Sequence, residues 1–446
     1  MRLRGGVKTP HHKDTAGLAP VAIPVPAEVT IPMSMGIGAP AKPVVNKGDH
    51  VKVGQLIGEA GGFVSSPIYA SVSGDVKSIG NMVGTSGAKM QAITIASDGL
   101  QEMWEGIAPP QVTDTESFIA AVRSSGVVGL GGAGFPTSVK LTVKDLNAVD
   151  YVLINGAECE PYITSDTRTM LDEADSIREG ILLLQKYMKA KRIIFGIESN
   201  KPQCVEKMRS VTRGIDGVEV VSLPSKYPQG GEKVLIYNLT GRTVPEGKLP
   251  LDVGVIVINC TTLAAIAKYI MTGVPLVRKT VTVAGSAIKE PKNVIAPIGA
   301  PMSALIDFCG GYKEEPKKIL YGGPMMGIAV DSSNTPLLKT TNAVLAFGAK
   351  EAEPPVTTPC IRCGRCVSSC PMHLMPLELE TAFTLKKPEL LKKGKVNLCM
   401  ECGSCAFACP AKRPLVQTMK LAKGALREYE AKLKAEKERE EAKKNG

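Results

Sequence analysis

Two short runs of cysteine share one spacing, and this feature restricts what the chain can fold into more than any other. The first run is CIRCGRCVSSCP, from Cys360 to Pro371, and the second is CMECGSCAFACP, from Cys399 to Pro410. Both follow the pattern C-x2-C-x2-C-x3-C-P, and thiolates spaced in this way can hold three corners of an iron–sulfur cube from one tight loop. We therefore predict two [4Fe–4S] clusters in a small helical domain.

The fourth cysteine of each run is expected to bind the cluster of the other run, as in two-cluster ferredoxins. The predicted ligands are Cys360, Cys363, Cys366 and Cys409 for the first cluster and Cys399, Cys402, Cys405 and Cys370 for the second. Gly364 and Gly403 follow the second cysteine of each run, where we expect them to keep the loop tight enough for N–H groups to face sulfur. A zinc knuckle or a disulfide knot is the alternative, but zinc sites usually pair two separate C-x2-C units.

The net charge of the chain indicates which classes of partner it can bind. The net charge is +11, and the chain from Pro359 onward holds 18 Lys and Arg against 10 Asp and Glu. Part of this excess balances the clusters, each of which carries about −2 when oxidised with four thiolates. The rest suits an acidic partner such as a ferredoxin, whereas no nucleic-acid motif accompanies it, so we expect no nucleic acid as a partner.

No apolar run is long enough for a transmembrane helix, and the start MRLRGGVKTPHHKDTA lacks the apolar segment of a signal peptide. We therefore expect a cytoplasmic protein whose membrane contact comes through partners. The adjacent His11 and His12 suit a surface turn better than metal ligation.

The pattern of residue types changes along the chain, and these changes predict several domains of different class. Residues 1–110 alternate β-branched residues with Gly, Asp and Pro turns, and they resemble the barrel-sandwich fold of lipoyl and biotinyl carriers. Their hairpin tip, PIYASVSG, lacks the lysine that such carriers modify, so we interpret the domain as structural, with a carrier role as the lesser alternative. Four further segments are expected: an α/β domain over 111–274, short strands around one helix over 275–348, the cysteine-rich domain over 349–419 and a charged helical tail over 420–446.

In the α/β domain, the sequence pattern predicts individual helices and strands. We expect helices over 113–126, 172–190, 231–241 and 262–273 and strands over 151–156, 192–198, 218–224 and 253–260. A glycine loop, GLGGAG, follows the first helix at Gly129–Gly134. It matches G-x-G-x-x-G formally, but no strand precedes it as the ordinary dinucleotide-binding motif requires.

The context of the loop gives it a more specific interpretation. GGAGFPTSVK followed by INGAECEPYITSD resembles the flavin site of the NADH-oxidising subunit of respiratory complex I, in which a glycine-rich loop cradles FMN phosphate. The resemblance implies a Rossmann-like domain that binds FMN and NAD(H). Backbone N–H groups at glycines suit a dianionic phosphate.

Carried over by position, the resemblance implies a role for each of several residues. Phe135, Glu158 and Glu160 would form the catalytic set, with Phe135 near the nicotinamide, Glu158 at the flavin and Glu160 placing NAD(H). The FMN phosphate and its ribityl chain would contact Gly131, Gly132, Gly134, Thr137, Lys140, Asn259 and Thr262. Asn155 would contact the flavin, and Tyr227 and Glu232 would line the nucleotide pocket. The chain departs from the complex I pattern at Leu130, at Ala157 and at Gln229–Gly231, where phosphate and adenine contacts are expected to differ.

The order of the parts resembles one family over nearly the whole chain, the C subunits of Rnf complexes, which are membrane-bound ferredoxin:NAD oxidoreductases. This order runs from LRGGVKTPHHKDTA through a barrel-sandwich, a flavin domain and a β-grasp module of SLBB type to two ferredoxin-like motifs. It implies a peripheral subunit on the cytoplasmic face of the membrane, with integral membrane subunits and an iron–sulfur subunit loaded by ferredoxin as partners. Ion translocation would be done by the membrane subunits.

The predicted cofactors, two [4Fe–4S] clusters, FMN and NAD(H), imply electron transfer. Nicotinamide exchanges two electrons as hydride and iron–sulfur clusters exchange one, and flavin chemistry connects the two. Two other functions stay open at this point: an NADH-dependent subunit that feeds a soluble reductase, and a relay or docking subunit without a working nucleotide site.

Overall fold

The structure is a computed structural model, and it describes residues 5–84 and 87–444. The chain divides into two compact units. The larger unit contains His11–Pro224 and Pro250–Glu353. The cysteine-rich unit contains the N-terminal residues up to Pro10, Ser225–Leu249 and the chain from Pro354 onward. In the described ranges, no helix has the length and apolar character needed to cross a membrane.

The larger unit begins with two small antiparallel sheets. The four-stranded sheet has the order β2 (Glu28–Pro32), β8 (Lys89–Ser97), β7 (Gly74–Val83) and β4 (His50–Val51), and the three-stranded sheet has the order β3 (Lys42–Pro43), β5 (Leu56–Glu59) and β6 (Ile68–Tyr69). Val29 and Ile31 of β2 lie opposite Ile95 and Ile93 of β8 in register. These side chains point to the same face, as the period of two requires, and they are fully buried.

A parallel sheet forms the centre of the larger unit. Its order is β11 (Val218–Leu223), β10 (Ile193–Glu198), β9 (Tyr151–Gly156) and β12 (Val255–Asn259), and every pair is parallel. β10 is buried along its whole length. Such continuous burial is typical of parallel sheets, which are covered on both faces.

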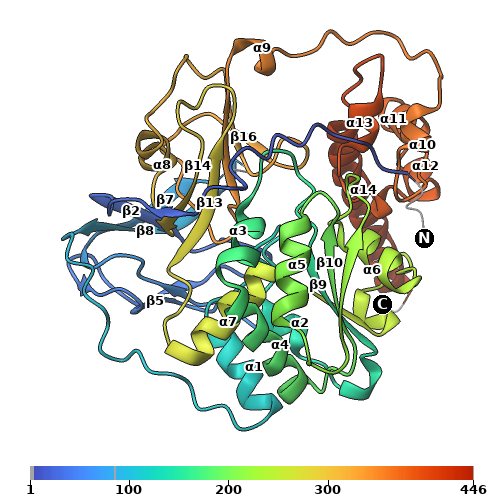
Figure 1. Cartoon of the computed structure of the whole chain (residues 1–446). Helices are drawn as coiled ribbons and strands as arrows, with labels where there is room; N and C mark the ends of the chain where they lie inside the picture. The colour runs from blue at the N-terminus through green and yellow to red at the C-terminus, as the bar shows by residue number, and fades with distance from the viewer. Residues whose placement is uncertain (1–4, 85–86, 445–446) are drawn as a thin grey trace. The chain divides into compact units, whose positions relative to one another are not determined.

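Helices cover one face of this sheet. They are α1 (Thr115–Ser124), α3 (Ser165–Asp172), α4 (Ala174–Met188), α5 (Pro202–Val211) and α7 (Cys260–Thr272), and Figure 1 draws them to the left of β9 and β10. Alternate strand residues, among them Val152 and Ile154 of β9 and Phe195 of β10, share one core with these helices. The short α2 (Thr137–Leu141) begins directly after the glycine loop.

The structure differs from the sequence expectations at two helices of this region. The helix α5 was not expected, although β10 and β11 are parallel and two such neighbours need a crossover, usually a helix. The helix expected over 172–190 is present as α4, which begins at Ala174, but the separate helix α3 before it was not expected.

A six-stranded sheet around one helix forms the third part of the larger unit. Its order is β1 (Val21–Ala22), β14 (Lys292–Pro297), β13 (Arg278–Ala284), β17 (Ala343–Phe347), β15 (Lys318–Tyr321) and β16 (Ile328–Val330), and α8 (Met302–Phe308) packs in the same core. β13 and β17 pair in parallel at its centre, between antiparallel neighbours. β1 joins this sheet even though it lies within the first hundred residues, and α9 (Ala349–Ala352) follows the last strand.

The cysteine-rich unit is helical. Its helices are α6 (Glu232–Thr240), α10 (Arg365–Ser368), α11 (Pro376–Thr384), α12 (Pro388–Lys393), α13 (Ser404–Ala408) and α14 (Leu415–Lys444). The sequence predicted a charged helical tail from Lys420, but the helix α14 begins before it, and its side chains Met419, Ala422 and Leu426 are buried in the core of this unit. The first turns of the tail are therefore part of the packed fold.

Candidate functional site

The parallel sheet reverses its strand order next to β9. From β9 the chain moves outward to β10 and β11, and then returns to add β12 on the other side of β9. Open α/β sheets bind ligands outside the carboxyl ends of the strands at such a switch point. Asn155 and Asn259 are register partners at the ends of β9 and β12, so both predicted site residues lie at this position.

The glycine loop is fixed to the start of α7 at the same edge. The N–H of Leu130 donates to Thr262 Oγ1 at 2.9 Å. Gly131 approaches Asn259 so closely that a Cβ there would lie 2.6 Å from the Asn259 Nδ2. Asn259 in turn caps α7, because its side-chain oxygen accepts from the N–H of Thr262 at 3.0 Å. The structure thus brings Gly131, Asn259 and Thr262 together.

The rest of the loop folds back on itself and onto the first β domain. The N–H of Gly129 donates to the carbonyl of half-buried Phe135 at 2.9 Å, and the N–H of Ile37 donates to the carbonyl of Gly134 at 3.2 Å. Gly134 has a φ of +67° and lies against Gly36, so a side chain there would be both strained and crowded. Gly132 is exposed with open space around it.

Two predicted phosphate contacts lie beside the loop in α2. Thr137 is buried, and Lys140 donates from Nζ to the carbonyl of Val257 in β12 at 2.9 Å. This bond joins α2 to the strand that carries Asn259. Lys140 therefore has a contact within the protein in addition to the phosphate role that the sequence predicts.

The acidic turn after β9 is folded inward. Glu158 has a φ of +46°, and its side chain is only 3% exposed. Its carboxylate accepts from the N–H of Asp166 at 2.6 Å and of Thr167 at 3.3 Å, at the start of α3. The carboxylate of Glu160 accepts from the N–H of Met325 at 3.0 Å. Both predicted glutamates are therefore tied to neighbouring segments of the larger unit.

Sequence reasoning missed two lysines that hold this turn. Lys13 donates to the carbonyls of Glu158 at 2.9 Å, Glu160 at 2.7 Å and Ile163. Lys201 donates to the carbonyl of Ala157 at 2.7 Å and is paired with the buried Glu198 at 3.2 Å. Burial lowers the pKa of Lys13 to about 8 and raises the pKa of Glu158, and the charge of each opposes the shift of the other. Lys13 stands in the segment GGVKTPHHKDTA, but no local pattern predicts contacts so distant in sequence.

The remaining predicted nucleotide contacts lie in the cysteine-rich unit. Tyr227 is 2% exposed and exchanges two backbone hydrogen bonds with Val7, and Glu232 is the first residue of α6. Three buried polar atoms near them have no hydrogen-bond partner among the described residues: Ser225 Oγ, Gln229 Nε2 and Asn238 Oδ1. Buried polar groups are nearly always satisfied in native proteins, so these atoms fit a segment that binds water or a polar ligand.

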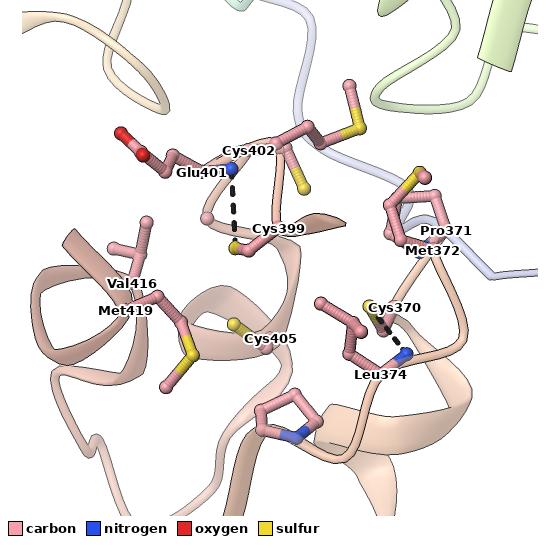
Figure 2. A pocket seen from close by; sticks show the side chains of 13 residues that line it. Cys370, Pro371, Met372, Leu374, Cys399, Glu401, Cys402, Cys405, Val416 and Met419 are labelled. Carbon is pink, nitrogen blue, oxygen red and sulfur yellow. Dashed lines mark hydrogen bonds between the residues drawn. The ribbon is translucent and has the colours of Figure 1, made fainter. Parts of the chain in front are cut away.

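The first cysteine-lined cavity contains four of the predicted ligands. Cys370, Cys399, Cys402 and Cys405 line a cavity with an empty volume of about 380 Å³. Figure 2 shows their four sulfur atoms arranged around a common space. The N–H of Glu401 donates to the Cys399 sulfur, and that of Leu374 donates to the Cys370 sulfur, both at 3.4 Å.

The second cavity contains the other four cysteines. Cys360, Cys363, Cys366 and Cys409 line an empty volume of about 730 Å³. In each run, the residue before the second cysteine and the glycine after it have a positive φ: Arg362 and Gly364 in the first, Glu401 and Gly403 in the second. This conformation turns an N–H toward sulfur, as the 3.3 Å bond from Arg362 to Cys360 illustrates.

The donor sets fit iron–sulfur clusters. Each cavity has four thiols with the fourth supplied by the other run, and N–H donors to sulfur stabilise the negative charge of a bound cluster. Burial raises the pKa of Cys399 to about 11 and of Cys405 to about 12. Without metal these thiols are therefore protonated, and binding would release their protons.

The backbone at Cys370 is also held by the N-terminus. The N–H of Gly6 donates to the carbonyl of Ser369 at 2.7 Å. Gly5 has a φ of +86°, and a Cβ there would lie 2.6 Å from the carbonyl oxygen of Cys370. The two glycines thus allow the chain to lie against one end of the first cavity.

Four family descriptions match the sequence. Residues 1–100 match the RnfC barrel sandwich hybrid domain, and residues 122–268 match the Nuo51 FMN-binding domain. Residues 280–329 match the SLBB domain, and residues 359–413 match the 4Fe–4S dicluster domain. The four kinds of domain predicted from the sequence are confirmed.

Whole-chain relatives decide the family. The sequence is 45% identical over 377 residues to the C subunit of the proton-translocating ferredoxin:NAD(+) oxidoreductase complex of Clostridium ljungdahlii, covering 84% of this chain and 82% of that protein. It is 41% identical over 424 residues to the C subunit of the Na(+)-translocating ferredoxin:NAD(+) oxidoreductase complex of Acetobacterium woodii, covering 94% and 96%. The chain belongs to the family of C subunits of ion-translocating ferredoxin:NAD(+) oxidoreductase complexes.

A third member of this family, the C subunit of the ion-translocating oxidoreductase complex of Rhodobacter capsulatus, is 40% identical over 96% of this chain and 84% of its own length. The family resemblance predicted from the sequence is thereby confirmed. Among solved structures, an NAD+-reducing [NiFe]-hydrogenase overlays with a TM-score of 0.49 at 19% identity, covering 69% of this chain and 63% of that chain.

Proposed function

We propose that this chain passes electrons between two [4Fe–4S] clusters, FMN and NAD(H), as a peripheral subunit of an ion-translocating ferredoxin:NAD oxidoreductase. The observation that carries the proposal is the combination, in one polypeptide, of an FMN-type parallel sheet and two cavities with four thiols each. When bound, the flavin would supply the conversion between two-electron and one-electron chemistry. The family relationship supports the same activity.

The residues of the chain would divide the work as follows. The glycine loop with Asn259 and Thr262 would bind the FMN phosphate end. The loop lies at the N-terminus of α7, next to the carboxyl ends of β9 and β12, where the strand order of the sheet reverses. Asn155 and the turn carrying Glu158 and Glu160 would shape the flavin and nicotinamide side. Phe135 would lie near the nicotinamide ring, and Glu160 would help to place NAD(H). Tyr227 and Glu232 would line a nucleotide pocket. Hydride transfer between two rings chiefly requires a fixed geometry, so no side chain need act as acid or base.

The setting would be the cytoplasmic face of the membrane, reached through other subunits. The loops of the second cavity support contact with an acidic electron-carrying partner. Cys360 and Cys363 are exposed there, and so are the neighbouring basic residues Arg362, Arg365 and Lys412. Complementary charge of this kind speeds the encounter of two proteins.

Anaerobic reconstitution of the purified chain with iron, sulfide and FMN tests the proposal. We expect about eight iron atoms and one flavin per chain, and loss of flavin absorbance on addition of NADH. The Cys402→Ser and Cys363→Ser variants should each lower the iron content without removing FMN. Eight irons with no flavin and no response to NADH would leave only a relay, and the proposed nucleotide site would be rejected.

A further inference from the structure

A segment near the N-terminus crosses the acidic turn of the larger unit. The carbonyl of His11 accepts from the N–H of Tyr162 at 3.0 Å, and the ring of His12 stacks on the ring of Tyr162 with centroids 4.6 Å apart. The hydroxyl of Thr15 contacts that of Thr164 at 2.6 Å. We call residues 11–16 the N-terminal strap.

Lys13 is the centre of the strap. Its ammonium faces three main-chain carbonyls of residues 158–163, at 2.9 Å from Glu158, at 2.7 Å from Glu160 and in close contact with Ile163. Its side chain is 14% exposed, and its counter-charge is the Glu158 carboxylate 4.0 Å away. Carbonyl oxygens that converge on one point repel each other unless a cation lies between them. The conformation of residues 158–163 therefore depends on the Lys13 ammonium, whereas Lys201 holds the carbonyl of Ala157 and contacts that of Glu158 at 3.4 Å.

The contacts of the turn continue to the glycine loop. The Glu158 carboxylate holds the N–H of Asp166, and the Asp166 carboxylate accepts from Asn259 Nδ2 at 2.7 Å and from Thr261 Oγ1 at 2.6 Å. Asn259 is the residue against which Gly131 packs. A series of polar contacts therefore runs from Lys13 through Glu158 and Asp166 to Asn259, and Gly131 of the loop packs against Asn259.

We propose that Lys13 is a positioning residue for the flavin site, which sets the conformation of the 157–163 turn and, through Glu158 and Asp166, the place of Asn259 beside the glycine loop. The identity of the ligand in this proposal rests on the proposed function, whereas the expected effect of Lys13 on the turn is independent of it. The hydrogen bonds of Lys13 go to the turn and not to the residues assigned to the FMN phosphate. Its effect on the cofactor is therefore indirect.

The test compares Lys13→Met with Lys8→Met, which removes an exposed lysine of the same N-terminal stretch. FMN affinity is measured by quenching of flavin fluorescence, and backbone order by hydrogen exchange of peptides covering residues 157–163. We expect Lys13→Met to weaken FMN binding about tenfold, a loss typical when outer-shell support of a site is removed, and to speed exchange in the turn. Lys8→Met should change neither.

Chemical rescue separates a positioning role from a general loss of packing. K+ should restore slow exchange and FMN affinity in Lys13→Met, because carbonyl oxygens at such distances bind this cation. Unchanged exchange and unchanged affinity in Lys13→Met would overturn the proposal. If the wild-type chain binds no FMN, the proposed function fails, and the exchange comparison still decides whether Lys13 sets the turn.

A second variant covers the case in which Lys13→Met does not fold. Lys13→Arg keeps the cation beside Glu158, but a planar guanidinium cannot point its donors at three converging carbonyls. We expect a folded protein with normal iron content, faster exchange at residues 157–163 and weaker FMN binding. Wild-type values for both measurements in Lys13→Arg would contradict the proposal.

Discussion

Individual polar side chains fix the glycine loop to the parallel sheet. Thr262 is 1% exposed, and its hydroxyl is the acceptor for the N–H of Leu130. Thr262→Val keeps the shape but leaves that N–H buried without a partner, which costs about 1–3 kcal/mol of stability. We expect a lower midpoint in urea unfolding and weaker FMN binding. Thr272→Val, at an exposed position on the same helix where water can replace the lost hydrogen bonds, should change both much less, and an equal loss in the two variants would contradict this view of Thr262.

A second residue makes stability depend on pH. Lys339 is 2% exposed and donates to the carbonyls of Pro67 and Gly126, both at 2.7 Å, and no salt bridge joins it to an acidic side chain of the described residues. Burial lowers the pKa of Lys339 to about 7. Between that value and its ordinary pKa of about 10.4, the unfolded chain binds more protons than the folded one, so stability rises with pH in this window.

The prediction for Lys339→Met follows from this rise of stability with pH. Urea unfolding of the variant should show a shallower rise of stability between pH about 7 and 10, by at most about 1.4 kcal/mol per pH unit. Lys47→Met, at an exposed position, serves as the matched control and should keep the wild-type slope. Equal slopes in all three proteins would mean that burial does not shift the pKa of Lys339.

At the scale of elements, glycine is favoured in the two cysteine loops but is unfavourable within the helix α14. Gly364 has a φ of +72° with open space around its Cα, whereas Gly424 lies within α14 and also has open space. Gly364→Ala should destabilise its loop by about 1–2 kcal/mol, because only the backbone conformation is affected, and should make iron more easily removed by a chelator. Gly424→Ala should instead gain up to about 1 kcal/mol, since alanine favours a helix interior.

Iron release and thermal unfolding measure both outcomes. The contrast between the two variants is the informative quantity, because each adds the same methyl group to the cysteine-rich unit. If Gly364→Ala releases iron no faster than Gly424→Ala, the left-handed loop conformation is not needed for cluster binding.

At the scale of the whole molecule, the excess of basic residues in the C-terminal part should attract an acidic electron carrier to the second cavity. Arg365 and Lys412 are exposed beside the second cavity. The double variant Arg365→Glu and Lys412→Glu should slow electron exchange with reduced ferredoxin about tenfold or more at low salt, and the wild-type rate should fall as salt rises. Lys434→Glu and Lys437→Glu, on the exposed end of α14, are the control. Stopped-flow measurements at several salt concentrations would contradict the prediction if both pairs behaved alike.

The sequence by itself determined the cluster motifs and most of the α/β elements. Cysteine spacing is a local property, and a buried strand such as β9 or a helix such as α1, with Asp114 as its cap, carries its own pattern of apolar and capping residues. The helix α5 between β10 and β11 was missed, although Pro202 at its first position and the buried Cys204, Val205 and Met208 at helical spacing are local signals for it.

Only the tertiary structure decided how these elements form a site. It assigned Glu158 to the start of α3, joined the Leu130 backbone to Thr262, and placed Lys13 against a turn 145 residues further along the chain. A charged side chain is usually solvated, and only the tertiary structure shows which ones are buried with partners. Burial and long-range pairing depend on packing between segments that no local pattern links. The motifs could therefore be identified from the sequence, whereas the contacts that hold them in place could not.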